Sequence, residues 1–343
     1  MEFGLIFFSG DESNKYNLIL ESAKFADKHG FNAIWTPERH FHKFGGLYPN
    51  PSVISAAISM ITKRIQIRSG SIIAPLHHPV RIAEEWSIVD NLSKGRAAIS
   101  LATGFSPIDF IFQPDNWDNR RNISFEYVEI LRKLWRGESL FMKDGVGENT
   151  EVELFPRPIS NELEIWLTCT KSEETFRKAG ELGCNILTGL IDMSTEELEA
   201  KLQIYFNTLE EYGHDRSNVK VTMLLHTFIG EDEEDVRKIV KEPFISYLKT
   251  FFKVVDTSNK SVHPDKNVDN MSASDRESIL NYGFEKFYNK GSLMGSPEKC
   301  MQVVKRMKGI GVTEIACLLD FGLDEDLVLK SLEKLNEFKN MNF

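Results

Sequence analysis

The stretch from Ile65 to Gly104 constrains the fold of this chain more than any other part of the sequence. A run with β-branched residues opens it, a helical pattern begins at Pro79, and an apolar run over 97–102 closes it. Between the last two segments, Ser93-Lys94-Gly95-Arg96 supplies the basic residues and the glycine that are typical of a helix end. The order of strand, helix and strand predicts a β-α-β unit, and such units form parallel sheets.

Small residues stand at the exit of the first strand of this unit. The sequence Arg68-Ser69-Gly70-Ser71 indicates either a close approach of the backbone to a bound group or an ordinary bulge. The residues alone leave both interpretations open.

The same alternation runs through the whole chain, which contains eight strand-like segments. They lie at 3–8, 32–35, 65–73, 97–102, 164–169, 185–188, 219–229 and 314–319, and each is followed by a helical pattern. No shift in composition marks a domain boundary. We therefore expect an α/β fold, a single (β/α)8 barrel with loop insertions over residues 1–343. The polar stretch 257–274 is expected to be a loop within a mobile lid that spans 254–288.

The composition excludes several classes of protein. The net charge of −10 argues against a nucleic-acid surface, and neither a signal peptide nor an apolar run of membrane-spanning length is found. We expect a cytoplasmic protein that binds neither nucleic acid nor membrane. Its four cysteines show no paired spacing and are expected to be reduced. No metal site is expected, because His40 and His42 lack a third ligand and no H-E-x-x-H motif occurs.

Polar residues follow or interrupt several strands near the carboxyl ends, which is where parallel barrels place their chemistry. Glu38 and His40 follow the second strand, His226 interrupts the seventh, and Asp320 follows the eighth. These four are the candidate catalytic residues, although a buried histidine such as His226 is as often satisfied by a structural neighbour. Asp109, after the fourth strand, is a candidate to gate or orient. His77 and His78, at a helix start, are weaker candidates.

A second polar group opens the helix after the fifth strand. Thr170, Lys171, Ser172 and Thr175 provide hydroxyls, a positive charge and the backbone N–H groups of a helix start, which together suit a phosphate. Ser172 and Thr175 would equally form an N-terminal cap without any ligand.

Several long motifs, in order, give the chain a family resemblance. WTPERHF, HHPVRIAEEWSIVDNLSKGR, LATGF and EIWLTCTKSEETFRKAGELGCNILT resemble the bacterial-luciferase-like FMN-dependent monooxygenases, and are most similar to their natural-product-biosynthesis subgroup. The resemblance implies a TIM barrel that uses reduced FMN and O2, through a flavin C4a-hydroperoxide, to oxygenate a secondary metabolite. The substrate would be a small molecule or an acyl or aminoacyl group on a carrier protein.

The resemblance also implies roles for particular residues. Thr170, Lys171, Ser172 and Thr175 would hold the FMN phosphate, and Ala102 and Thr103 would contact the flavin. Gly70 and Ser71 would form the bulge under the ring, joined by a non-prolyl cis peptide bond. Luciferase itself has Glu-His-His-Phe where this chain has Glu38-Arg39-His40-Phe41. Because an arginine stays protonated, Arg39 cannot serve as the base, so His40 becomes the candidate and light emission is not expected.

Partners follow from the same resemblance. The chain has no G-x-G-x-x-G after a strand, so a separate flavin reductase is expected to supply reduced FMN. A homodimer is expected through the helix with the apolar positions Ile54, Ala57, Ile58 and Ile61, a face that could also be core. Two alternatives remain: a deazaflavin-dependent hydride-transfer oxidoreductase on the same barrel, and a non-catalytic flavin-binding protein.

Overall fold

Eight parallel strands close into a barrel in the structure, a computed structural model that describes residues 1–8, 16–43, 45–190, 193–262 and 273–341. The barrel strands are β1 (Glu2–Ile6), β2 (Ala33–Thr36), β3 (Gln66–Ser69), β5 (Ala97–Ala102), β8 (Ile165–Thr168), β9 (Asn185–Gly189), β10 (Val221–Ile229) and β12 (Glu314–Leu318). Pairings of β9 with β10, β10 with β12 and β12 with β1 complete the circle. The expected (β/α)8 barrel is confirmed.

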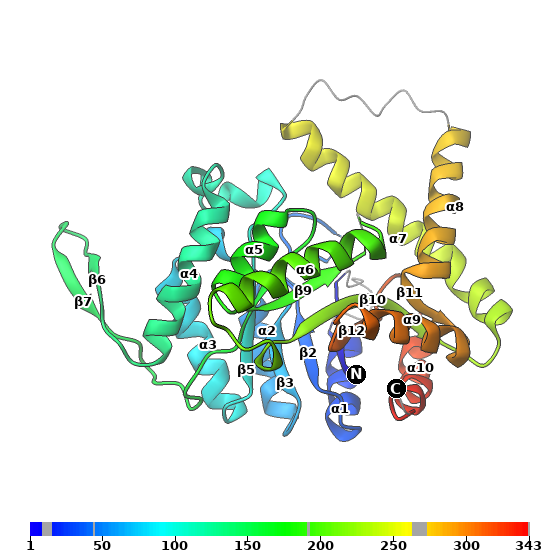
Figure 1. Ribbon diagram of the computed structural model, residues 1–343, viewed down its shortest axis with the longest axis horizontal. Coiled ribbons are helices and arrows are strands. Elements are labelled where there is room, and N and C mark those ends of the chain that lie inside the picture. The colour runs from blue at the N-terminus through cyan, green and yellow to red at the C-terminus, as the bar shows by residue number, and fades with distance from the viewer. Residues whose placement is uncertain (9–15, 44, 191–192, 263–272, 342–343) are drawn as a thin grey trace.

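Helices surround the barrel in the order that the sequence predicts (Figure 1). They are α1 (Asn17–Lys28), α2 (Pro51–Ile61), α3 (Pro79–Ser93), α4 (Arg120–Trp135), α5 (Glu173–Glu181), α6 (Thr195–Glu211), α9 (Pro297–Gly309) and α10 (Glu325–Lys339). Proline opens α2, α3 and α9, where its missing N–H has no intrahelical partner to lose. Within the described residues, no helix is both long and apolar enough to cross a bilayer.

A buried ion pair lies inside the barrel, and its arginine packs between the indole rings of Trp35 and Trp166. Arg68 donates from Nη1 to both carboxylate oxygens of Glu314, at 2.6 and 2.8 Å, and both side chains are fully buried. The Cζ atom of Arg68 lies 4.7 Å from the ring centre of Trp35 and 4.2 Å from that of Trp166. This confirms that the two tryptophans belong to the core.

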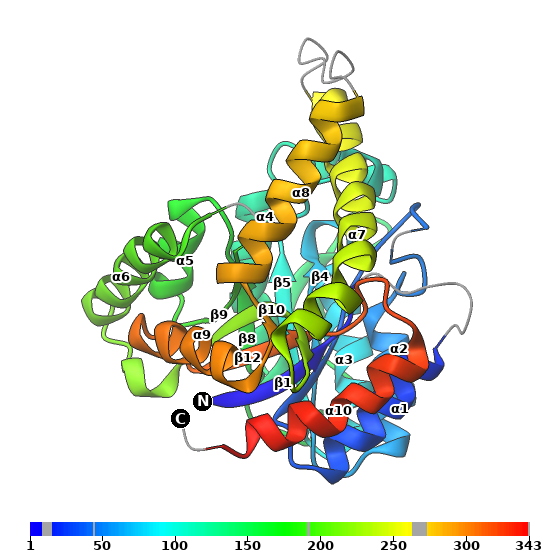
Figure 2. The same ribbon diagram turned by 90° about the vertical axis from the view of Figure 1, so that its right-hand side faces the viewer.

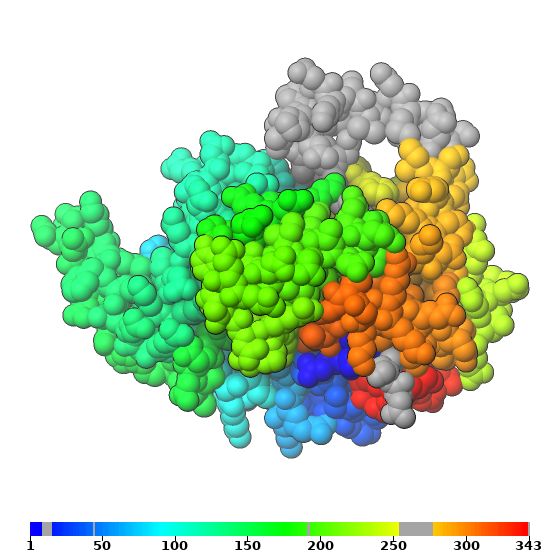
Figure 3. Space-filling view, in the orientation of Figure 1, coloured from blue at the N-terminus to red at the C-terminus, as the bar shows by residue number. Residues whose placement is uncertain are grey.

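Three strands were not anticipated from the sequence. Strands β6 (Leu140–Lys143) and β7 (Asn149–Val152) form an antiparallel hairpin that projects from the body (Figures 1 and 3). Strand β11 (Ser292–Gly295) pairs with the second half of β10. The strand predicted over 65–73 is divided into β3 and the two-residue strand β4 (Ile72–Ile73), which pairs with β5. Their shortness leaves too few residues for a period to show.

The expected lid is built largely of helix. Helices α7 (Glu233–Val262) and α8 (Ala273–Lys290) rise as a long hairpin and lie side by side (Figures 1 and 2). The expected loop over 257–274 is therefore wrong at both of its ends, and residues 263–272 lie outside the described residues. Helix cooperativity accounts for the difference, because α7 and α8 are already anchored by buried residues such as Phe244 and Phe284, and adding a residue to an existing helix costs little. That the segment moves stays a prediction.

The apolar residues of α2 that were expected to share one face differ in burial. Ile54 and Ile58 point into the core, with exposed fractions of 9% and 0%. Ala57 and Ile61 are exposed instead, together with Val53 and Met60 of α2 and Ile88 and Leu92 of the adjacent α3. The interpretation of Ile54 and Ile58 as contact residues is therefore wrong, since the helix turns them inward.

Candidate active site

Polar and aromatic side chains converge at the carboxyl ends of the barrel strands, which we call the mouth. Glu38 to His40 follow β2, Asp109 lies in the short helix η2 (Pro107–Ile111) after β5, and Asp320 follows β12. A cleft of 330 Å³ at the other end of the barrel is lined by Met1, Val221 and Thr313, at the amino ends of their strands. Because parallel barrels carry their chemistry at the carboxyl ends, the mouth is the candidate site.

Glu38 is the most connected side chain in the mouth. Its Oε1 atom lies 2.9 Å from Nε2 of His40 and 2.6 Å from Nε2 of His77, and its Oε2 accepts from the Ile73 amide at 2.6 Å. Burial raises the pKa of Glu38, but the hydrogen bonds from His40, His77 and Ile73 outweigh it and the pKa is lowered overall. Glu38 is therefore held as a buried carboxylate.

Arg39 occupies the centre of the mouth. Its guanidinium carbon lies 3.8 Å from the ring centre of Phe8. Burial lowers its pKa, while Tyr247, Asp109 and Asp320 oppose that shift. Asp320 accepts the Phe8 amide with both carboxylate oxygens, at 2.8 and 2.9 Å, which joins the end of β12 to the end of β1. The predicted residue Asp320 thus helps to fix the rim of the mouth.

His226 lies in an aromatic cage. The rings of Phe244, Tyr247, Phe287 and Phe321 surround it at centroid distances of 4.8 to 5.8 Å, each nearly perpendicular to the imidazole. Its buried Nε2 atom has no hydrogen-bond partner among the residues that the structure describes, and burial lowers its pKa to about 3. The imidazole is therefore neutral at physiological pH and does not act as an acid.

Asp109 is a buried carboxyl whose charge interacts with those of His40, Arg39 and Glu38. Within the described part of the chain, its buried Oδ1 atom has no hydrogen-bond partner. Burial raises its pKa to about 6, and this shift is opposed by His40 and Arg39 and assisted by Glu38. Asp109 consequently changes charge close to neutral pH, within reach of the electrostatic fields of His40 and Arg39.

The turn after β3 has the form that the sequence predicts. The Gly70–Ser71 peptide bond is cis, which confirms that expectation. Gly70 has no room for a side chain, since an added Cβ would lie 3.0 Å from Trp35 Cβ and 3.2 Å from Ile6 Cδ1. The Ser71 hydroxyl bonds to those of Ser100, at 2.8 Å, and Thr168, and the last two lie 3.0 Å apart. The turn between β3 and β4, the middle of β5 and the end of β8 thus meet in one hydroxyl cluster.

The candidate phosphate residues lie at the start of α5. Ser172 is the N-cap residue, but its side chain makes no cap hydrogen bond, so the N-cap interpretation of Ser172 is wrong. Thr170 and Lys171 are exposed, whereas Thr175 is buried. The first turn of α5 therefore keeps amide groups without a side-chain cap, as an anion site requires.

The structure brings Glu38 and His40 into direct contact and places Asp320 and His226 around Tyr247. Two residues of the site were undervalued from sequence. His77 stands 39 positions from Glu38, and its role becomes visible only when the segments that follow β2 and β4 lie side by side. Tyr247 lies on α7, and no pattern in the sequence singled it out. Asp109 was identified by its position after the fourth predicted strand.

The comparisons with known proteins now identify the class of protein. The sequence model of the family described as luciferase-like monooxygenase matches residues 1–314, so the chain belongs to this family of flavin-dependent monooxygenases. It is 25% identical over 334 residues to the oxygenase component of the flavin-dependent trigonelline monooxygenase of Acinetobacter baylyi, covering 93% of this chain and 88% of that protein. It is 26% identical over 346 residues to the alkanal monooxygenase alpha chain of Aliivibrio fischeri, covering 97% and 96%.

Solved structures share the fold. The monooxygenase RslO1 from Streptomyces bottropensis superposes with a TM-score of 0.78 at 20% identity, covering 98% of both chains. The oxygenating constituent of 3,6-diketocamphane monooxygenase from Pseudomonas putida, in complex with FMN, gives 0.75 at 20% identity, covering 98% of this chain and 97% of that one. An F420-dependent secondary alcohol dehydrogenase gives 0.72 at 16%, covering 99% of both.

Proposed function

We propose that this chain is the oxygenase component of a two-component monooxygenase that uses reduced FMN and O2. The observation that carries the proposal is the Gly70–Ser71 turn, closely packed from below by Trp35 and Ile6 and lined by the Ser71, Ser100 and Thr168 hydroxyls, next to the Glu38–His40 pair. Such a surface suits a planar, polar-edged ring. Reduced flavin would supply the electrons that activate O2, which amino-acid side chains alone do not provide.

The residues at the rim fit the same cofactor. The uncapped first turn of α5, with Thr170, Lys171, Ser172 and Thr175, would bind the phosphate through backbone N–H groups and hydroxyls. Ala102 and Thr103, both partly exposed at the end of β5, would face the ring. The aromatic cage around His226 would keep water from the reacting centre, and Arg39 would carry positive charge beside it.

His40 would handle protons in the mouth, with Glu38, Asp320 and the neutral His226 around the substrate. Exposed Phe41 and Phe112 stack at 5.5 Å beside His40, which favours a substrate with an apolar part. A secondary metabolite, small or bound to a carrier protein, meets this requirement. The name of the trigonelline relative, an oxygenase component, supports a separate reductase for this chain, since no dinucleotide motif is present.

A homodimer through α2 and α3 is part of the proposal. The exposed apolar residues Val53, Met60, Ile61, Ile88 and Leu92 lie on two adjacent helices and would be covered by the same face of a second copy. The cytoplasmic location expected from the sequence stays a prediction.

A deazaflavin-dependent hydride transfer is the second candidate function. It is favoured by the fold alone, because F420-dependent enzymes share this barrel at 16% identity. A non-catalytic protein is disfavoured by the polar residues that remain in the mouth.

An anaerobic titration with reduced FMN tests the proposal. We expect saturable binding and, after O2 is admitted, a delayed return of the absorbance of oxidised FMN compared with free flavin. Binding of reduced F420 with no binding of FMN would instead establish the deazaflavin enzyme, and binding of neither would point to the non-catalytic protein.

A matched pair of variants locates the phosphate. Lys171→Ala should weaken FMN binding several-fold, whereas Lys201→Ala, at a half-buried lysine on α6, should leave it unchanged. Equal effects of the two variants would contradict the placement of the phosphate at α5.

A further inference from the structure

The number of donors that meet at Glu38 determines its protonation. An ionised carboxylate accepts hydrogen bonds and donates none. One oxygen of Glu38 receives both Nε2 atoms, from His40 and His77, and the other receives the Ile73 amide. The Ile73 amide can only donate, and an ionised Glu38 accepts from all three nitrogens at once, whereas a protonated Glu38 would have to donate to one imidazole nitrogen. We take Glu38 as ionised, the form that leaves each of the three nitrogens as a donor.

An ionised Glu38 determines the protonation of both histidines. Each Nε2 atom must carry a hydrogen in order to bond to Oε1. In a neutral imidazole the proton then resides on Nε2, and Nδ1 is left as a proton acceptor. The ring of His40 packs edge-on against Phe112 at 4.9 Å and at a tilt against Phe41 at 5.8 Å, and these contacts restrict its rotation.

We propose that Glu38 is a positioning residue that holds His40 in the Nε2–H tautomer, so that His40 Nδ1 is the proton acceptor of the mouth, and that His77 is the residue that keeps Glu38 in place. This inference rests on the proposed function, in which His40 handles protons, and it assigns the reactive atom. Glu38 itself neither gives nor takes the proton. A proton taken up at Nδ1 makes His40 an imidazolium, which the Glu38 carboxylate stabilises through the Nε2–H bond.

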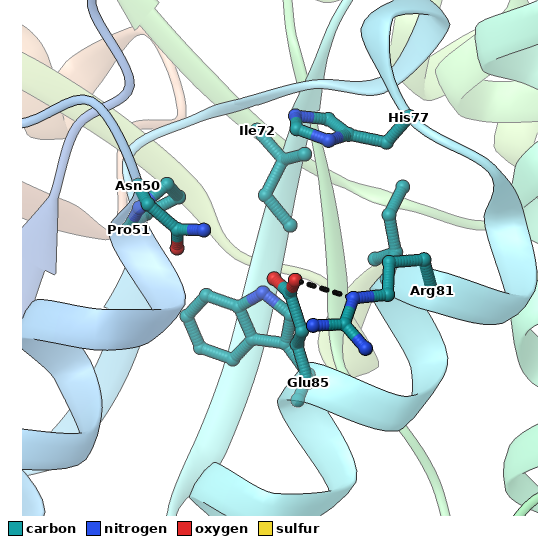
Figure 4. A pocket seen from close by; sticks show the side chains of 8 residues that line it. Asn50, Pro51, Ile72, His77, Arg81 and Glu85 are labelled. Atoms are coloured by element: carbon teal, nitrogen blue, oxygen red, sulfur yellow. Dashed lines mark hydrogen bonds and ion pairs between the residues drawn. The ribbon is translucent and has the colours of Figure 1, made fainter.

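His77 connects this arrangement to the surface. Its side chain is 28% exposed, whereas those of His40 and Glu38 are 7% and 0% exposed. His77 lines a shallow pocket between α2 and α3 with Asn50, Arg81 and Glu85 (Figure 4). Burial lowers the pKa of His77, but the bond to Glu38 and the charges of Glu38 and Glu85 raise it overall. A positively charged His77 would stabilise the ionised Glu38 at Oε1, the same oxygen that His40 contacts.

Nitrogen NMR of the histidine-labelled protein, without flavin, tests the tautomers directly. The eight histidines give separate ring signals, and His40→Gln and His77→Gln assign the two that matter. We expect the His40 ring to carry its proton on Nε2 alone in the wild type. A ring protonated on Nδ1, or an equal mixture, would overturn the proposal.

Two glutamate variants test whether Glu38 sets the tautomer of His40. In Glu38→Gln the amide can donate as well as accept, so we expect His40 to lose its single tautomer. His77, which bonds to the same oxygen, is expected to change as well, while the remaining histidines keep their signals and show that the fold is intact. The control Glu85→Gln makes the same chemical change beside His77, outside the three bonds to Glu38, and should leave the His40 tautomer unchanged. An unchanged His40 in Glu38→Gln would refute the role of Glu38.

The role of His77 has its own test. His77→Leu removes a donor to Glu38, and we expect the His40 Nε2–H to exchange with solvent about tenfold faster or more. His77→Gln retains an N–H donor and should restore slow exchange in large part. Identical exchange in Leu, Gln and wild type would show that His77 only fills space. Because none of these measurements uses flavin, their failure is distinct from a failure of the FMN titration.

Discussion

At the scale of single residues, the Arg68–Glu314 pair shows how strongly the free energy of unfolding depends on pairing a buried charge. Glu314→Gln would leave the Arg68 guanidinium charged inside the barrel, and we expect a loss of about 3 kcal/mol in the free energy of unfolding. Urea denaturation measures it. The control Glu164→Gln breaks an exposed pair with Lys220, 3.4 Å apart, and should cost under about 1 kcal/mol. Similar losses in both variants would contradict the argument.

Asp109 makes the stability depend on pH. Burial raises its pKa from 3.8 to about 6, so the folded state favours the protonated form and pays a penalty once the carboxyl ionises. Asp109→Asn should therefore gain stability over the wild type as pH rises from about 4 to 6, reaching about 1–2 kcal/mol above that range. Denaturant unfolding of both proteins across these pH values measures the difference. A gain that is greatest at low pH would have the wrong sign.

The sequence predicts which single residues belong to the site, but it does not predict which residues contact each other. Polar residues at strand ends identified Glu38, His40 and Asp320, because a parallel barrel gathers those ends in one place. Two partners, His77 with Glu38 and Arg68 with Glu314, were not predicted, since residues 39 and 246 positions apart meet only through the register of the barrel.

At the scale of elements, the turn after β5 depends on Gly104. Its φ is +77°, and an added Cβ would lie 2.9 Å from both Ile73 Cγ2 and Phe110 Cε2. Gly104→Ala should cost about 2–3 kcal/mol through strain and overpacking together. Gly30→Ala is the matched control: its φ is +71° and nothing lies within 4 Å, so only the backbone cost of about 1 kcal/mol is expected. Urea denaturation compares them, and equal losses would show that packing around Gly104 is unimportant.

The α7–α8 hairpin is held to the barrel by its aromatic base. Phe244 is fully buried and contacts His226, Phe284 and Phe321. Phe244→Ala should lower the free energy of unfolding by about 3–5 kcal/mol and increase proteolysis within the hairpin. Phe252→Ala, at a side chain 39% exposed on the same helix, should change either quantity little. If the two variants behave alike, the hairpin is held by other contacts.

Elements with a clear period were predicted, and those without one were missed. The unit from Ile65 to Gly104 forms β3, β4, α3 and β5 as its pattern indicates. The hairpin of β6 and β7 was missed because its strands are only four residues long, and because Leu140-Phe141-Met142 is a continuous apolar run while β7 is mostly polar, so neither shows an apolar alternation. The helical ends of the expected loop were missed because helix propagation from the anchored parts of α7 and α8 is not visible in local composition.

At the scale of the whole molecule, the exposed apolar face of α2 and α3 predicts assembly. The helical pattern predicted one apolar face on α2, for a dimer or for the core, whereas the structure shows that Ile54 and Ile58 face the core while Met60, at 68% exposure, and Ile88, at 47%, face outward. A stable dimer buries roughly 800 Å² on each partner, and two adjacent helices of this length can supply such an area.

The double variant Met60→Asp/Ile88→Asp should therefore convert a dimer to a monomer, because two buried carboxylates from each copy would face their like in a two-fold interface. Sedimentation velocity over a range of protein concentrations measures the mass. Tyr282→Asp, at a residue 73% exposed on α8, is the control and should leave the dimer intact. A wild-type protein that stays monomeric throughout would exclude this interface, whereas a dimer insensitive to the double variant would place it on another face. Either result leaves the barrel mouth as described, since every contact of Glu38 that fixes His40 comes from within one chain.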